Sequence, residues 1–214
     1  LEGAEITCRK SCWSPRWSVD AAVASMVANV QRISSDMTSA ASRPLLEEAI
    51  DILSHLVSFD TESSKSNLPL IECIADHLRG LGIPMRLTYD DDKRKANLFA
   101  TLGAGKPGGV VLSGHTDTVP WEGQAWSMDP LSAEVRDARL YGRGSADMKG
   151  YIGLVVAQAQ AFLEADLPYA VHFAFSYDEE TGGMGARQMI ADLRDAGHEH
   201  QGRENGHVGH AGHP

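Results

Sequence analysis

The chain has 214 residues, of which 43% are hydrophobic and 22% charged, so it is long and apolar enough to bury a full globular core. A formal net charge of −10 and scattered Lys and Arg argue against a nucleic-acid partner, and no apolar run reaches the length of a membrane-spanning helix. The three cysteines, Cys8, Cys12 and Cys73, do not indicate a disulfide framework. We therefore expect a cytoplasmic protein that acts on a small molecule.

The first 43 residues show no pattern typical of a folded enzyme. The chain begins with Leu1 rather than Met, and the short apolar patch 21–28 is bordered by Asp20, which is unusual in a signal peptide. We expect residues 1–43 to be an N-terminal extension outside the core, with a natural start at Met37. A weak targeting peptide is the alternative.

From residue 44 onward, apolar residues recur with the periods of helices and strands. The predicted helices cover 45–57, 68–81, 148–163 and 184–193, and the predicted strands cover 84–89, 96–102, 109–113 and 169–176, with a short hairpin at 140–141. The continuous apolar run Val110 to Leu112 is typical of a strand covered on both faces of a sheet. Strands separated by helices predict a layered α/β fold.

The periodic pattern stops after Asp195. Residues 196–214 contain one large apolar residue, Val208, and five of the nine histidines. We expect this His/Gly-rich tail to be disordered or the product of a frame shift, because the loss of apolar periodicity is abrupt. A histidine tract with weak metal affinity is the alternative.

The first candidate for chemistry is the segment 113–120, at the end of the predicted strand. Alternation along an extended chain places His115 and Asp117 on the same side. A histidine that binds a metal commonly gives its second ring proton to a carboxylate, so His115 suits a ligand and Asp117 the group that orients it. A hydrogen-bonded turn is the alternative.

The second candidate is the glycine-rich segment 141–150, which runs from a strand into a helix. Its Asp147 would point into the cleft beyond the strand ends, where open α/β sheets bind ligands. A carboxylate there suits a bridge between two metal ions, and the alternative is helix capping by Ser145 or Asp147. A phosphate-binding loop is excluded, because Lys149 is followed by Gly150 rather than Ser or Thr.

The third candidate is the acidic turn after the strand 169–176. Of two adjacent carboxylates at a strand end, one can bind a metal while the other accepts a proton from water. Glu179 and Glu180 suit these two tasks, although a solvated acidic turn is the alternative. Nitrogen and oxygen donors without cysteine suit zinc, manganese or cobalt, and two such ions can activate water for attack on an amide.

These motifs resemble those of the co-catalytic zinc amidohydrolases and peptidases, a family that includes acetylornithine deacetylases, succinyl-diaminopimelate desuccinylases, aminoacylases and glutamate carboxypeptidases. The likeness extends over 45–195 and rests on three segments in the same order: 111–120, 126–150 and 178–180. It implies a three-layer αβα zinc-peptidase-like catalytic domain that uses two Zn²⁺ ions, with Co²⁺ or Mn²⁺ as alternatives.

The resemblance also assigns roles to single residues. His115 would bind one ion, Asp147 would bridge both, and Glu180 would bind the second. Glu179 would act as general base and acid, while Asp117 would orient the histidine.

Several parts of the family pattern are not recognisable in this sequence. They are a further carboxylate ligand, the lid and dimerisation domain, and a final histidine ligand. We therefore expect 44–195 to be a partial metal-dependent catalytic domain, and we do not expect this chain to form the homodimer of intact family members.

Within the family, the sequence around Gln124, Trp126, Asp129 and Pro130 is most similar to the acetylornithine deacetylases. This similarity implies removal of the acetyl group from N-acetylornithine, a step of arginine biosynthesis. The alternatives are another N-acyl-amino-acid hydrolase, such as a desuccinylase, aminoacylase or carboxypeptidase, and an inactive truncated remnant.

Overall fold

The computed structural model describes residues 43–197, and those from Glu47 onward belong to one unit. The helices are α2 (Arg43–Ser58), α3 (Leu68–Gly80), α4 (Lys149–Ala157), α5 (Ala159–Glu164) and α6 (Met184–Asp195). The strands are β1 (Met85–Tyr89), β2 (Ala96–Leu102), β3 (Gly109–His115), β4 (Glu134–Arg136), β5 (Arg139–Tyr141) and β6 (Ala170–Ser176). The expected start at Met37, and the predicted extension and tail apart from Arg43, Ala196 and Gly197, lie outside the described residues.

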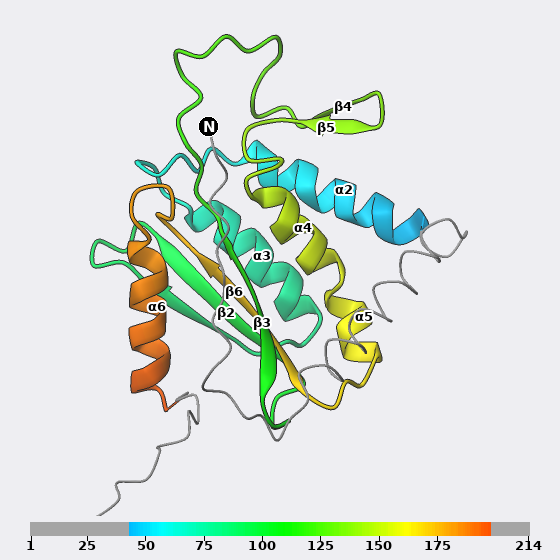
Figure 1. Ribbon diagram of the computed structural model, residues 1–214, viewed down its shortest axis with the longest axis vertical. Coiled ribbons are helices and arrows are strands. Elements are labelled where there is room, and N and C mark those ends of the chain that lie inside the picture. Colours follow the sequence, from blue (N-terminus) through cyan, green and yellow to red (C-terminus); the bar gives the residue numbers. More distant parts are fainter. Residues whose placement is uncertain (1–42, 198–214) are drawn as a thin grey trace, which may run out of the picture. The chain divides into compact units, whose positions relative to one another are not determined.

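Four strands form one sheet in the order β1-β2-β6-β3, and β4 pairs with β5 in a separate hairpin (Figure 1). β2 is antiparallel to both β1 and β6, whereas β3 runs parallel to β6 with His115 opposite Ser176. Because parallel strands end at the same edge of a sheet, the segments that follow β3 and β6 lie side by side. This pairing brings the first and third candidate motifs together.

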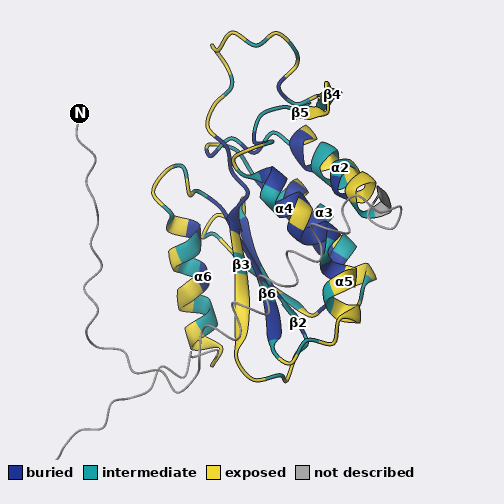
Figure 2. Ribbon diagram, turned by 45° about the vertical axis from the view of Figure 1, so that its right-hand side comes forward, coloured by how far each residue is buried: buried dark blue, intermediate teal, exposed yellow. Residues whose placement is uncertain are grey.

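Helices cover both faces of the sheet. α3, α4 and α5 lie on one face and α6 lies on the other (Figures 1 and 2). The fully buried side chains include Phe173 and Phe175 of β6, Leu98 of β2 and Ile74 of α3. The predicted layered α/β fold is thereby confirmed, and in the described part of the chain no helix is long and apolar enough to cross a membrane.

Two details differ from the sequence prediction. The single helix expected at 148–163 is divided at Gln158 into α4 and α5. The prediction that β3 is covered on both faces is wrong, because Val110 is 36% and Val111 45% exposed. β6 is the one strand that pairs with β3 among the described residues, so the apolar run indicates hydrophobicity but not a central place in the sheet.

Gly150, in the first turn of α4, allows the loop that carries Asp147 to approach the helix closely. A Cβ atom at this position would lie 2.2 Å from the backbone oxygen of Ser145. We expect Gly150→Ala to lower the free energy of unfolding by about 1–3 kcal/mol, as overpacking does. Gly80→Ala is the matched control in α3, because nothing lies within 4 Å of its added Cβ atom. Urea denaturation of both variants checks this, and equal stability would contradict the packing argument.

Candidate metal site

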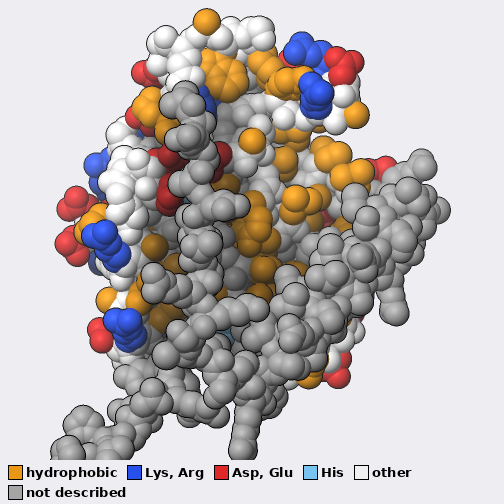
Figure 3. Space-filling view, viewed as in Figure 1, with side chains coloured by type: hydrophobic (Ala, Val, Ile, Leu, Met, Phe, Trp, Pro, Cys, Tyr) orange, Lys and Arg blue, Asp and Glu red, His pale blue; other side chains and the backbone are white. Residues whose placement is uncertain are grey.

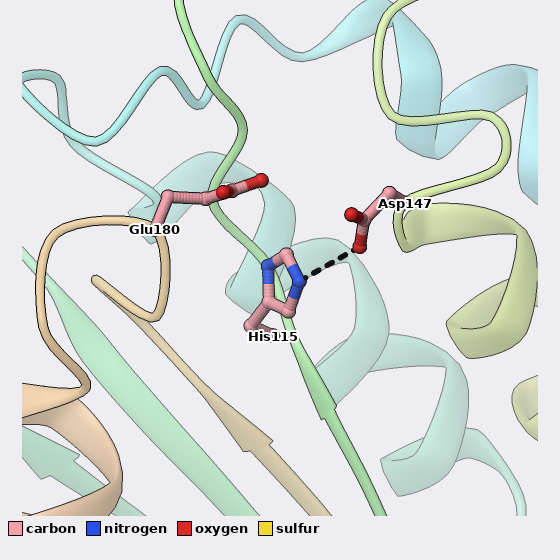
Figure 4. Close-up of side chains that lie close together, drawn as sticks. All are labelled: His115, Asp147 and Glu180. Carbon is pink, nitrogen blue, oxygen red and sulfur yellow. Dashed lines mark hydrogen bonds and ion pairs between the residues drawn. The ribbon is translucent and has the colours of Figure 1, made fainter. Parts of the chain in front are cut away.

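Three side chains that could bind a metal ion meet at the edge where β3 and β6 end. His115 is the last residue of β3, Asp147 precedes α4, and Glu180 lies in the turn between β6 and α6. One ligand atom of each lies within 4.8 Å of the others, and the three side chains point toward a common space (Figure 4). Asp147 and Glu180 lie 32 and 65 positions after His115 in the sequence. The sheet and the loop before α4 bring all three residues together.

The imidazole of His115 is held in one orientation. Its Nδ1 atom lies 3.0 Å from the backbone oxygen of Asp117, and because a carbonyl only accepts hydrogen bonds, Nδ1 carries the proton. Nε2 is directed at Asp147 Oδ1, 3.0 Å away. The neutral ring would therefore present an unprotonated Nε2 to a metal ion beside Asp147.

Asp117 contacts both sides of the site. Its carboxylate lies 3.4 Å from His115 Nδ1, so the orienting hydrogen bond comes mainly from its backbone oxygen. The carboxylate instead accepts hydrogen bonds from the backbone N–H groups of Glu179 and Glu180, at 3.1 and 3.2 Å, and from Ser63 Oγ at 2.6 Å. Burial alone would raise the pKa of Asp117, but the interaction with the His115 ring, and the hydrogen bonds from Ser63 and the Glu179 N–H group, hold that pKa below its ordinary value.

The two glutamates occupy different environments. The Glu179 side chain is 58% exposed, and its Oε2 lies 3.8 Å from His115 Nε2. The pKa of Glu180 is raised, first by burial and then by the negative charges of Asp147, Asp117 and Glu179, although His115 opposes the shift. Acidic side chains also gather on the surface above the strand ends, in the upper part of the molecule (Figure 3). A cation would relieve this crowding of negative charge.

Two residues beside the site carry no recognisable signal in the sequence. Ser63 lies in the polar segment after α2, 54 positions from its partner Asp117, so only the fold shows the contact. Lys149 is fully buried and donates a hydrogen bond of 2.6 Å to the backbone oxygen of Phe59. Burial lowers the pKa of Lys149 to about 8. In the sequence, Lys149 belongs to the glycine-rich segment 141–150, where an exposed lysine would be equally typical.

The donor set fits a divalent transition metal. One imidazole nitrogen and two carboxylate oxygens suit zinc, manganese or cobalt, and three protein ligands leave a position for water or substrate. Within residues 43–197, these side chains are the one group of three or more His, Cys, Asp or Glu residues that could hold an ion. They supply enough ligands for one catalytic-type metal position.

Metal binding at this site should depend on pH through His115. Burial disfavours the charged ring, but hydrogen bonds and charges from Asp117 and Asp147 prevail and raise the pKa of His115 to about 9. Below that pH an ion must displace a proton from Nε2, so we expect Mn²⁺ affinity to increase by up to about tenfold per pH unit up to pH 9. Calorimetry at about pH 6.5, 7.5 and 8.5, in buffers of different ionisation enthalpy, measures both affinity and proton release. Affinity independent of pH would contradict the assignment.

The sequence is similar to a known protein family and to individual curated relatives. Residues 111–213 match the model of Peptidase family M20/M25/M40. The chain is 37% identical over 134 residues to an acetylornithine deacetylase of Proteus mirabilis, a match that covers 62% of this chain and 34% of that protein. An acetylornithine deacetylase of Pasteurella multocida is likewise 37% identical over 134 residues, with 62% and 35% covered. The chain thus spans about a third of the length of these relatives.

Solved structures share the fold. Human carnosine dipeptidase 1 superposes with a TM-score of 0.61 at 24% identity, over 77% of this chain and 37% of that chain. The M20 family metallo-carboxypeptidase Sso-CP2 from Sulfolobus solfataricus gives a TM-score of 0.61 at 18% identity, over 70% and 35%. In sequence, this chain is thus similar to the Peptidase family M20/M25/M40 and to acetylornithine deacetylases, and it shares its fold with solved metallopeptidase structures.

Proposed function

We propose that this chain provides part of the metal site of a hydrolase that removes the acetyl group from N-acetylornithine. The observation that carries the proposal is the convergence of His115, Asp147 and Glu180 within 4.8 Å, with the carboxylate of Glu179 beside them. The identity of 36–37% to acetylornithine deacetylases supports the choice of substrate.

In this proposal His115 and Asp147 would hold one ion, and Asp147 and Glu180 would hold a second. When bound, divalent ions at such a site activate water and polarise the amide carbonyl. We propose Zn²⁺, because nitrogen and carboxylate ligands with an open position are typical of catalytic zinc, with Co²⁺ or Mn²⁺ as alternatives.

Glu179 has the position and freedom of a general base. Its exposed carboxylate would take the proton of the attacking water and then give that proton to the nitrogen of the departing ornithine. Asp117 would keep the His115 ring in the orientation that presents Nε2. The same Asp117 fixes the turn on which Glu179 lies, through the backbone bond of 3.1 Å.

The biological setting follows from the proposed substrate. Deacetylation of N-acetylornithine yields ornithine, a precursor of arginine, so the parent enzyme would serve arginine biosynthesis. Only three cysteines in 214 residues suit a reducing compartment, and we place the reaction in the cytoplasm.

Metal analysis and a hydrolysis assay on the same preparation test the proposal. We expect the 214-residue chain to bind a divalent ion and to cleave N-acetylornithine faster than N-succinyl-diaminopimelate, other N-acetyl amino acids or dipeptides. Faster cleavage of one of these other substrates would favour a desuccinylase, aminoacylase or carboxypeptidase instead.

The second candidate is a remnant without hydrolytic activity. It is favoured by the number of potential ligands, because residues 43–197 bring together three such side chains, fewer than two fully coordinated ions would need. Weak metal binding without hydrolysis of any acylated amino acid would support this candidate, whereas turnover at ordinary rates would exclude it.

A further inference from the structure

A closed ring of hydrogen bonds surrounds the carboxylate of Asp117. Ser63 Oγ donates to Asp117 Oδ2 at 2.6 Å, and the backbone oxygen of Ser63 accepts a hydrogen bond from Lys95 Nζ. Lys95 Nζ also donates to Asp178 Oδ1 at 2.5 Å. Glu179 and Glu180, which follow Asp178, donate hydrogen bonds from their backbone N–H groups to the Asp117 carboxylate and close the ring. The ring therefore joins four segments that are distant in sequence.

The ring holds a backbone conformation that is unfavourable by itself. Asp178 has a φ of 56°, in the left-handed region that residues other than glycine seldom adopt. Its side chain is fixed by Lys95, and its backbone oxygen accepts a hydrogen bond of 2.7 Å from the N–H group of Gly183. The left-handed residue turns the chain so that both following N–H groups bond to Asp117.

The groups in the ring are shielded from water. Ser63 is 8% and Asp117 2% exposed, and the side chains of Lys95 and Asp178 are 14% and 19% exposed. Lys95 Nζ also lies 5.9 Å from the centroid of the Tyr177 ring, within the range of a cation–π contact. Shielded hydrogen bonds to charged groups are stronger than exposed ones, so the ring should make the turn at 178–180 rigid.

We propose that Ser63 and Lys95 are positioning residues that fix, through Asp117 and Asp178, the turn that presents Glu179 and Glu180 to the metal site. Ser63 Oγ makes one further, longer bond of 3.5 Å to the backbone oxygen of Thr118. The other side-chain hydrogen bonds of Ser63 and Lys95 go to members of the ring, and none goes to the three potential metal ligands, so the two residues act on the site through the ring. The expected change in metal affinity rests on the proposed metal-dependent function. The rigidity of the turn does not, because it can be measured without any metal.

The test compares Lys95→Met with Lys106→Met in the full chain. Lys106 is a matched control, because its Nζ also bonds one carboxylate, Asp166, and one backbone oxygen, that of Leu167, but lies away from the site. We expect Lys95→Met to weaken Mn²⁺ affinity by about 10–100-fold, as loss of an outer partner of a metal site does, and Lys106→Met to change it less than about twofold. Ser63→Ala should act in the same direction, and Ser63→Thr should restore binding.

Hydrogen exchange without metal provides the second readout. We expect the amides of Glu179 and Glu180 to exchange at least about tenfold faster in Lys95→Met and to keep the wild-type rate in Lys106→Met. Unchanged exchange and unchanged Mn²⁺ affinity in Lys95→Met would overturn the inference and leave the proposed function intact. A wild-type chain that binds no Mn²⁺ but shows the exchange difference would overturn the proposed function and retain the positioning role.

Discussion

Replacing Glu179 by glutamine should lower the rate of N-acetylornithine hydrolysis by about 10²–10⁴-fold, the usual contribution of a general acid–base group. Glutamine keeps the size of the side chain but cannot take a proton from water. Glu179 is not part of the group of three potential ligands, and its carboxylate Oε2 lies 3.8 Å from His115 Nε2. The bound metal should therefore stay nearly unchanged, which elemental analysis and turnover measured on one preparation would establish.

The neighbouring residue provides the matched control. Glu180→Gln alters the same kind of side chain one position further along, but removes a proposed ligand. We expect it to reduce metal content first and activity as a result, so that added Mn²⁺ restores part of its turnover. Equal loss of metal and activity in both variants would contradict the division of roles between the two glutamates.

The sequence predicted most of the fold because apolar periodicity reports directly on local structure. The expected strand 96–102 coincides with β2, and the expected helix 184–193 differs from α6 by two residues at its end. The apolar run at Val110 and Val111 was misleading, because hydrophobicity does not specify which strands are neighbours. Pairing between β3 and β6 depends on contacts across 61 positions, which periodicity does not report.

The candidate site was predictable to the extent that its residues follow strands. His115 ends β3 and Glu180 follows β6, and parallel strands end at one edge, so their proximity follows once the two strands are known to pair. The supporting residues gave no such signal. Ser63 and Lys95 lie in polar connecting segments whose composition suits any exposed loop, and only the tertiary structure brings them to Asp117 and Asp178.

Removing the carboxylate of Asp147 should have the largest effect on metal binding. Asp147 Oδ1 lies 3.0 Å from His115 Nε2, and in the proposed arrangement the Asp147 carboxylate would be a ligand of both ions. We expect Asp147→Asn to weaken Mn²⁺ or Zn²⁺ affinity by more than about 100-fold, beyond the roughly 10–100-fold typical of outer partners. Since a ligand at about 100 times its Kd stabilises a folded protein by about 2.7 kcal/mol, the variant should also lose the rise in Tm that the metal gives the wild-type chain.

Asp76→Asn is the appropriate control for the change of charge. The Asp76 side chain on α3 is 75% exposed and that of Asp147 76%, so both substitutions remove one exposed negative charge. A general electrostatic attraction of cations to this acidic chain would make the two variants lose affinity equally, and high salt would abolish the difference from wild type. Loss confined to Asp147→Asn and retained at high salt would instead mean that the ion is bound by this carboxylate directly, as we propose from its position beside His115.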